Sequence, residues 1–182
     1  MRISSALALI PFVLLLGCAT SPPPRAQSPL IPLEKANLKL ALEEQEGLEI
    51  LWENARDVRD FYRGGVQHKA KAETDFKEKK YPEALKEYDL SNDFLMTALK
   101  YIDEDSCEYP LFEGTTILFF PNLLVADNYL KVGIILKETG REDSARSKWK
   151  KALSYVQKSL QYENTEWGLG VEKEIRSLLG PR

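Results

Sequence analysis

Apolar side chains recur at steps of three and four residues along most of the chain beyond residue 32, which is the spacing of one buried face of an α-helix. In the proline-free stretch 33–62, the positions that follow this spacing are Leu48, Leu51, Trp52, Ala55, Val58 and Tyr62. Segments in which apolar and polar residues alternate, as a half-buried β-strand requires, are almost absent. The pattern therefore predicts an all-α body of about six or seven helices.

Glycine and proline mark the expected ends of these helices. Gly47 is expected to split the stretch 33–62, and Gly64 and Gly65 to end the helix that follows, because glycine readily adopts the left-handed conformation found at helix ends. Pro82 suits the first turn of a helix, where its missing N–H costs nothing. The helices predicted after this stop span 66–79, 82–102, 122–138, 142–162 and 165–179, and residues 103–121 are expected to be irregular.

The beginning of the chain has a different pattern, in which one cation precedes a continuous apolar run. Arg2 is followed by a largely apolar run of 14 residues, 3–16, and then by Gly17 and Cys18. A membrane-spanning helix needs about 20 residues to cross the hydrocarbon core. A cleaved export signal is therefore a better interpretation than a retained transmembrane helix.

The residues Leu15, Leu16, Gly17 and Cys18 together resemble the lipobox of bacterial lipoprotein signal peptides. This resemblance implies that residues 1–17 are cleaved off and that Cys18 carries a diacylglycerol, with a further acyl chain on the new amino terminus. Because Ala19 rather than Asp follows the cysteine, it also implies the outer membrane, facing the periplasm, although one sequence does not decide between inner and outer membrane. The alternative is an ordinary cleaved signal in which Cys18 has no role.

Residues 18–32 are rich in proline and are expected to form a tether between this anchor and the folded body. They include three consecutive prolines, 22–24, and two further ones, Pro29 and Pro32. Proline fixes φ and removes a backbone donor, so the segment is expected to form neither helix nor paired strand. Residues 33–182 are then one all-α domain.

A second resemblance concerns the later helices, where small and large residues alternate at fixed intervals. The spacing of eight residues resembles the tetratricopeptide repeat of 34 residues: Tyr129, Val132, Gly133, Leu136, Gly140, Ala145, Trp149 and Ala152. A divergent copy shares Ala72, Phe76, Tyr81, Ala84 and Tyr88. The resemblance implies antiparallel helix hairpins stacked as a short right-handed superhelix, with repeats at about 65–98 and 126–159 and a closing helix at 165–179.

The mechanical reason for this pattern does not depend on the family. Gly133 and Ala145 are small where two antiparallel helices are expected to approach closely, and Trp149 is expected to fill the space between them. Gly140 allows the backbone to reverse between the two helices. These residues are therefore interpreted as packing residues and not as catalytic ones.

Tetratricopeptide arrays generally bind peptides or proteins in the concave surface formed by the first helix of each pair. Carried over by alignment, the candidate partner-binding residues are Asp127, Leu130, Ile134, Lys137 and Glu138 in the clear repeat, and Lys69, Glu73, Phe76 and Lys77 in the divergent one. Such a surface combines apolar residues with charges of both signs. It suits a helix or an extended segment of a protein partner.

Composition excludes several other classes of function. A formal net charge of −3 gives no reason to expect nucleic-acid binding. The single histidine, His68, cannot build a multi-histidine metal site, and no His-Glu-x-x-His, paired-cysteine or Gly-x-Ser-x-Gly arrangement occurs, so no catalytic residue, metal or cofactor is predicted. The cations around Trp149 are interpreted as a solvated helix face, with contact to anionic lipid or an acidic partner left open: Arg141, Arg146, Lys148, Lys150, Lys151 and Lys158.

The sequence thus favours a non-enzymatic, lipid-anchored periplasmic scaffold that binds an envelope protein or peptide, for example in the assembly or maintenance of the cell envelope. The alternative is an accessory lipoprotein subunit of a solute transport system, resembling those associated with TRAP-type transporters. In that case the segment 111–121 and the interior of the helices would line a path for a small molecule. The partner and the oligomeric state do not follow from the sequence.

Overall fold

The computed structural model describes residues 29–43, 55–101 and 119–180, and these residues form six α-helices. The helices are α1 (Leu38–Glu43), α2 (Ala55–Lys77), α3 (Tyr81–Tyr101), α4 (Phe119–Glu138), α5 (Glu142–Tyr162) and α6 (Glu166–Leu179). Within these ranges the chain forms no β-strand apart from one isolated bridge, so the all-α prediction is confirmed. The predicted signal peptide, Cys18, most of the tether, the predicted split at Gly47 and residues 103–118 of the predicted irregular segment lie outside the described residues, whereas residues 119–121 of that segment are helical.

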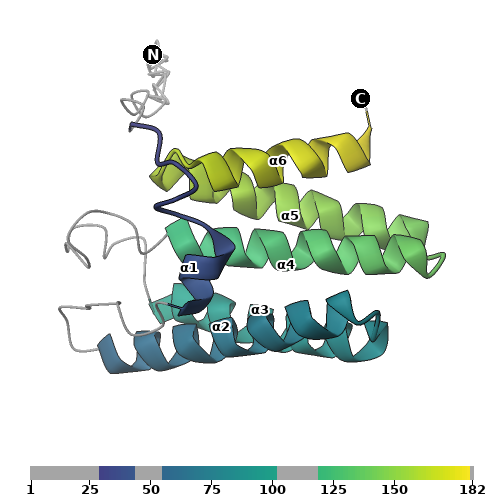
Figure 1. Cartoon of the computed structure of the whole chain (residues 1–182), viewed down its shortest axis with the longest axis horizontal. Helices are drawn as coiled ribbons and strands as arrows, with labels where there is room; N and C mark the ends of the chain where they lie inside the picture. Colours follow the sequence, from purple (N-terminus) through teal and green to yellow (C-terminus); the bar gives the residue numbers. More distant parts are fainter. Residues whose placement is uncertain (1–28, 44–54, 102–118, 181–182) are drawn as a thin grey trace, which may run out of the picture.

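The long helices pack as two hairpins with α6 added on one side (Figure 1). The helix α2 lies along α3, and α4 lies along α5. The two hairpins meet mainly through α3 and α4, while α6 packs on α5 and touches α4. All turns between these helices are short where the structure describes them, so neighbours in the chain are also neighbours in space.

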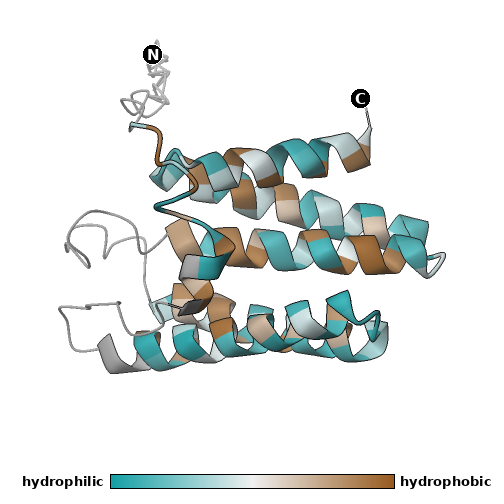
Figure 2. Cartoon of the chain, in the orientation of Figure 1, coloured by the Kyte–Doolittle hydropathy of each residue, from teal (hydrophilic) through white to brown (hydrophobic). Residues whose placement is uncertain are grey.

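The helix α4 lies at the centre of this arrangement. Almost every side chain from Phe119 to Leu136 is buried, whereas the other long helices bury one side only. Figure 2 accordingly shows hydrophobic residues along α4 and hydrophilic ones on the outer edge of α2. By length and mean hydropathy α4 would also suit a membrane span, but 83% of that apolar window is buried inside the protein, as expected of a central core helix.

The sequence prediction that Gly64 and Gly65 end a helix is wrong, because α2 continues through both residues to Lys77. Their role is to let α3 approach. A Cβ atom on Gly64 would lie 2.7 Å from Cδ1 of Phe94, and one on Gly65 would lie 2.6 Å from Cγ of Leu95. Glycine is therefore required at these positions by the neighbouring helix, and the local pattern cannot distinguish this role from a helix stop.

The predicted close approach between α4 and α5 is confirmed. A Cβ atom on Gly133 would collide with the indole ring of Trp149, and both Ala145 and Trp149 are buried. The indole N–H of Trp149 donates a hydrogen bond to the carbonyl of Leu130 at 3.3 Å. Gly140 reverses the chain between the two helices with φ of 76°, a conformation that favours glycine.

Residues 29–43 form an N-terminal strap that runs from the start of α6 to α2, across the helices between them (Figure 1). Ile31 makes a parallel bridge to Thr165: its N–H donates to the carbonyl of Asn164 at 2.8 Å, and its own carbonyl accepts from the N–H of Glu166 at 2.9 Å. The strap then crosses to the α2–α3 hairpin, where α1 packs (Figure 1). Ala36 and Ala41 are buried in the common core.

Thr165, the residue bridged to Ile31, also fixes the start of α6. Thr165 is its N-cap residue, and the hydroxyl of Thr165 accepts a hydrogen bond from the N–H of Gly168 at 3.0 Å. This cap explains why α6 begins one residue after the predicted start. Similarly, α4 begins at Phe119 rather than at Asn122, because Pro121 falls in its first turn, where a missing N–H is tolerated.

Candidate functional site

A buried network of polar side chains connects the two hairpins. Lys69 on α2 has no exposed surface, and its ammonium group reaches α4, where Nζ lies 2.6 Å from Oδ2 of Asp127 and 2.8 Å from Oδ1 of Asn128. Within its own helix the same atom lies 3.2 Å from Oε1 of Glu73. A buried ammonium is costly unless it is paired and hydrogen-bonded, and here one cation faces two carboxylates.

Residues of α3 extend this network. The phenol of Tyr88 donates to Oε1 of Glu73 at 3.0 Å, and the amide of Asn128 donates to Ser91 at 2.8 Å and to Asn92 at 3.0 Å. Burial, together with the nearby carboxylates, raises the pKa of Tyr88 far above its usual value. The phenol therefore stays protonated and serves as a donor at all ordinary pH values.

The burial of this network corrects the predicted partner-binding surface. Lys69, Glu73, Asp127 and Leu130 were predicted to line an open groove, but all four are buried between the hairpins. Periodicity places these residues on the same side of their helices correctly. It does not reveal that the second hairpin and α3 close over that side, so these four residues offer little surface to a partner.

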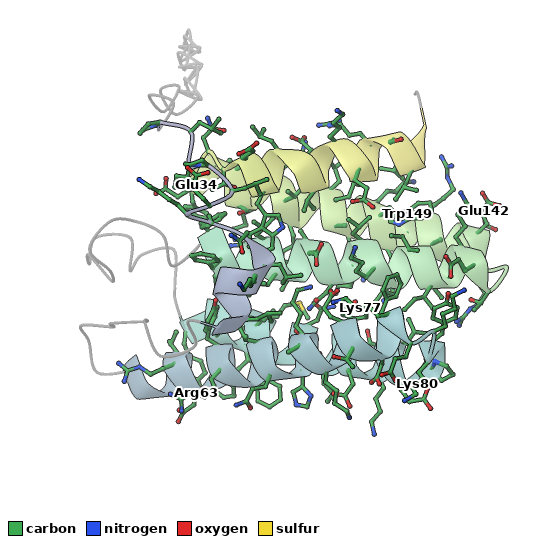
Figure 3. All side chains as sticks on the ribbon, in the orientation of Figure 1. Glu34, Arg63, Lys77, Lys80, Glu142 and Trp149 are labelled. Atoms are coloured by element: carbon green, nitrogen blue, oxygen red, sulfur yellow. The ribbon has the colours of Figure 1, made fainter. Side chains whose placement is uncertain are left out.

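The remaining predicted residues lie at the end of the molecule where the α2–α3 and α4–α5 turns meet. Lys77, Lys137 and Glu138 are exposed there, and Phe76 and Ile134 are half-buried. Figure 3 shows Lys77 and Lys80 at this end together with Glu142, which starts α5. We call this end the turn end, and the opposite end, where the strap bonds Thr165, the strap end.

Two residues that the alignment did not assign to partner binding complete the exposed surface at the turn end. Tyr81 stacks at a tilt against Phe76 with 6.4 Å between ring centroids, and its hydroxyl donates to the carboxylate of Glu138. This hydrogen bond raises the pKa of Tyr81 above its usual value. Lys131 places its ammonium 5.7 Å from the centroid of the Phe76 ring. We define the turn-end rim as Phe76, Lys77, Tyr81, Lys131, Ile134, Lys137 and Glu138.

The rim joins the hairpins through side chains from three helices. Tyr81 was identified from the sequence only as a repeat position, and Lys131 carried no signal because a single lysine on a helix has no distinguishing pattern. In the rim, the rings of Phe76 and Tyr81 lie beside the ammonium group of Lys131 and the carboxylate of Glu138, whereas the ammonium group of Lys137 lies 6.0 Å from the centroid of the Trp149 ring on α5. Such a surface can contact an apolar side chain and an acidic group of a protein partner at the same time.

His68 has a structural role in the described part of the molecule. Its Nδ1 lies 2.7 Å from Oε2 of Glu87, and its ring stacks on Phe94 at 5.3 Å. Lys71 bonds the other oxygen of Glu87, and these two hydrogen bonds hold the pKa of Glu87 below its usual range. No group of three or more potential metal-binding side chains occurs among the residues that the structure describes.

The cations of α5 separate onto different sides of the helix. Lys148 and Lys151 place their ammonium groups 5.2 and 5.7 Å from the centroid of the Tyr129 ring, so both are used in contacts with α4. Arg146 and Lys150 face the end of α6 instead. The single solvated face expected from the sequence is thus two surfaces with different neighbours.

Comparisons with known proteins do not identify a relative of this arrangement. No family model matches the chain, and neither curated proteins nor solved structures give a match. The functional argument therefore depends on the residues of this chain and their contacts.

Proposed function

We propose that this chain is a lipid-anchored periplasmic scaffold whose body is a short array of tetratricopeptide-like helix hairpins and whose turn-end rim binds a protein partner. The observation that carries the proposal is the lipobox-like sequence Leu15–Cys18 followed by a proline-rich segment. Several acyl chains hold a protein at a membrane far more firmly than one, since each buried methylene contributes about 0.8 kcal/mol.

The hairpin geometry supports the tetratricopeptide part of the proposal. Gly133 faces Trp149, and Ala145 is buried at the same interface, as the repeat pattern requires. The body would thus serve as a rigid support, and the rim would be held on helices rather than on loops. A site on rigid elements loses little conformational entropy when a partner binds.

The anchor is tested by metabolic labelling with radioactive palmitate, followed by mass analysis of the mature chain. Acylation at Cys18 predicts label and an acyl adduct in the native chain, and loss of both in Cys18→Ser. The chain has one other cysteine, Cys107, so Cys107→Ser is the matched control and is expected to keep both. Label that persists in Cys18→Ser, or a native chain without an adduct, contradicts the anchor.

The rim is tested with a photo-crosslinking amino acid introduced at Lys137 in living cells. A partner that contacts the rim is expected to form a specific crosslink at position 137 and none at Glu174, an exposed position on α6. The identified partner is then purified, and Ile134→Asp is expected to weaken its binding. Equal crosslinking at both positions, or unchanged binding by Ile134→Asp, rules out the rim as the binding surface.

A further inference from the structure

A cleft of about 860 Å³ lies between the first half of α5 and the last turn of α6. Arg146, Lys150 and Leu153 line it from α5, and Arg176 and Leu179 line it from α6. Because α6 begins at the strap end, this cleft lies at the turn end, where Figure 1 shows the carboxyl terminus of α6 beside the start of α5.

The charges in this cleft are only partly compensated within the protein. Arg176 is bonded to Glu172 at 2.6 Å, and Arg146 donates one hydrogen bond to the carbonyl of Leu179 at 3.1 Å. Lys150 is exposed and forms no ion pair or hydrogen bond with any residue that the structure describes. The carboxyl end of the α6 dipole supplies a partial negative charge of about 0.5, which is less than the charge of the cations around it.

The geometry of the lining indicates the shape of a ligand. Arg146, Lys150 and Leu153 occupy positions i, i+4 and i+7 of α5, so they form one stripe along the helix axis. Leu153 and Leu179 add an apolar floor beside the cations. A second helix packs naturally along such a stripe, with acidic side chains toward the cations and an apolar side chain toward the floor.

The position of the cleft favours a protein over a lipid surface. Under the proposed function, the tether leaves the body at the strap end, where Ile31 is bonded to Thr165. The cleft lies at the other end of α6, whose 14 residues span about 21 Å at about 1.5 Å per residue. The cations therefore face away from the point at which the body is joined to the membrane.

We infer that the α5–α6 cleft binds an acidic amphipathic helix of a protein partner. This inference deepens the proposed scaffold function and rests on it for the direction in which the cleft faces. The carboxylates of the partner would pair with Lys150 and Arg146, and its apolar face would cover Leu153 and Leu179. The cleft is separate from the turn-end rim, so the two surfaces are tested independently.

The test uses the mature chain, residues 18–182, with Cys18→Ser so that binding is independent of the anchor. The probe is a fluorescent synthetic helix in which Glu and Leu recur at three- and four-residue steps, and its control has Lys in place of every Glu. Fluorescence anisotropy is expected to show saturable binding of the Glu helix and no saturable binding of the Lys control. No saturable binding up to about 1 mM, the weak end of specific affinities, overturns the inference.

Charge reversal locates the site. Lys150→Glu is expected to weaken binding of the Glu helix by about tenfold. The double variant with Arg146→Glu is expected to bind the Glu helix still more weakly. Lys86→Glu is the matched control, since Lys86 is exposed on α3 and the change in net charge is the same. An equal loss in Lys86→Glu shows general attraction only and overturns the site.

Vesicles of phosphatidylglycerol distinguish the lipid alternative. The same chain is expected to sediment with them weakly and with no dependence on Lys150. Strong sedimentation that Lys150→Glu abolishes, together with no binding of the Glu helix, overturns the protein partner in favour of an anionic lipid surface. These outcomes leave the test of Cys18 acylation unaffected, so failure of the cleft and failure of the anchor are distinguishable.

Discussion

Glycines inside the helices of this protein occupy two kinds of environment. Gly133 is buried under the ring of Trp149, and an added Cβ atom would collide with that ring. Gly170 lies on the exposed side of α6, and an added Cβ atom would meet no other atom within 4 Å. The same substitution at these two positions therefore separates the effect of a close helix contact from the intrinsic cost of glycine in a helix.

We predict that Gly133→Ala lowers the free energy of unfolding by about 1–3 kcal/mol, because Trp149 must move in a tightly packed interface. We predict that Gly170→Ala raises it by about 0.5–1 kcal/mol, because alanine restricts the unfolded chain and favours the helix. Urea titrations of both variants measure these changes. If Gly133→Ala is also stabilising, the close approach of α4 to α5 is incorrect.

Glu87 gives the protein a defined dependence on pH. Hydrogen bonds from Lys71 and His68 lower the pKa of Glu87 in the folded chain. A carboxylate with a lowered folded pKa stabilises the protein above its unfolded pKa of about 4.3, and this stabilisation is lost as the pH falls through the folded value. The contribution of Glu87 is therefore present at neutral pH and disappears in acid below about pH 4.

We predict that Glu87→Gln lowers the melting temperature at about pH 6 and reduces its fall between about pH 6 and about pH 3, since the variant no longer has this group to protonate. Glu174→Gln is the control, because Glu174 is exposed on α6. Calorimetry at a series of pH values measures both. Equal pH profiles for Glu87→Gln and the native chain would show that the bonds from Lys71 and His68 do not stabilise the fold.

At the scale of elements, local patterns and contacts between elements differ in how well the sequence predicts them. The bounds of α5 and the end of α6 agree with the sequence prediction, because caps and turn residues act within a few residues of a helix end. The continuation of α2 through Gly64 and Gly65 was missed, because the reason for both glycines is the side chains of another helix. The spacing of residues within α2 contains no information about that neighbouring helix.

The same limit explains the outcome for the candidate site. Asp127 and Lys69 were selected because they occupy groove positions of the repeat, and they do lie together, 2.6 Å apart. Whether such a pair is exposed or buried depends on how closely the hairpins approach, and spacing along the chain does not specify this. The bridge between Ile31 and Thr165 corrects the expectation that residues 18–32 pair with no other segment, since Ile31 lies in that range. Such a bridge joins residues far apart in the sequence and has no motif.

The contact between the hairpins is expected to depend on Lys69. We predict that Lys69→Met lowers the free energy of unfolding by about 3–5 kcal/mol, because it leaves the buried carboxylates of Glu73 and Asp127 without their cation. Lys69→Met combined with Asp127→Leu is expected to recover part of this loss, since one unpaired charge is removed. Chemical denaturation of both variants provides the comparison.

Lys71→Met is the matched control for this prediction. Lys71 also bonds a carboxylate, that of Glu87, but its side chain is 63% exposed, so solvent screens the pair. We expect a much smaller change than in Lys69→Met. Equal effects in the two variants would mean that the buried network does not hold the hairpins together, and a double variant no more stable than Lys69→Met would point to lost packing instead of unpaired charge.

At the scale of the whole molecule, the strap makes the two ends of the helical body different. Backbone hydrogen bonds between Ile31 and the α5–α6 turn fix where the chain enters the fold, and the rim and the basic cleft both lie at the opposite end. If Cys18 carries the anchor, residues 19–30 are all that separates the membrane from this entry point. Both candidate surfaces then face away from the lipid.

The orientation of the body relative to the membrane can be measured with a fluorophore attached at Glu34→Cys or Glu142→Cys in the acylated chain. Both variants also carry Cys107→Ser. Figure 3 shows Glu34 at the strap end and Glu142 at the turn end. Because α4 alone spans about 30 Å over its 20 residues, we predict that brominated lipids in a supported bilayer quench the probe at position 34 more strongly than the probe at position 142. Stronger quenching at position 142 would mean that the turn end faces the membrane, in which case the cations of the cleft would meet lipid headgroups instead of a protein partner.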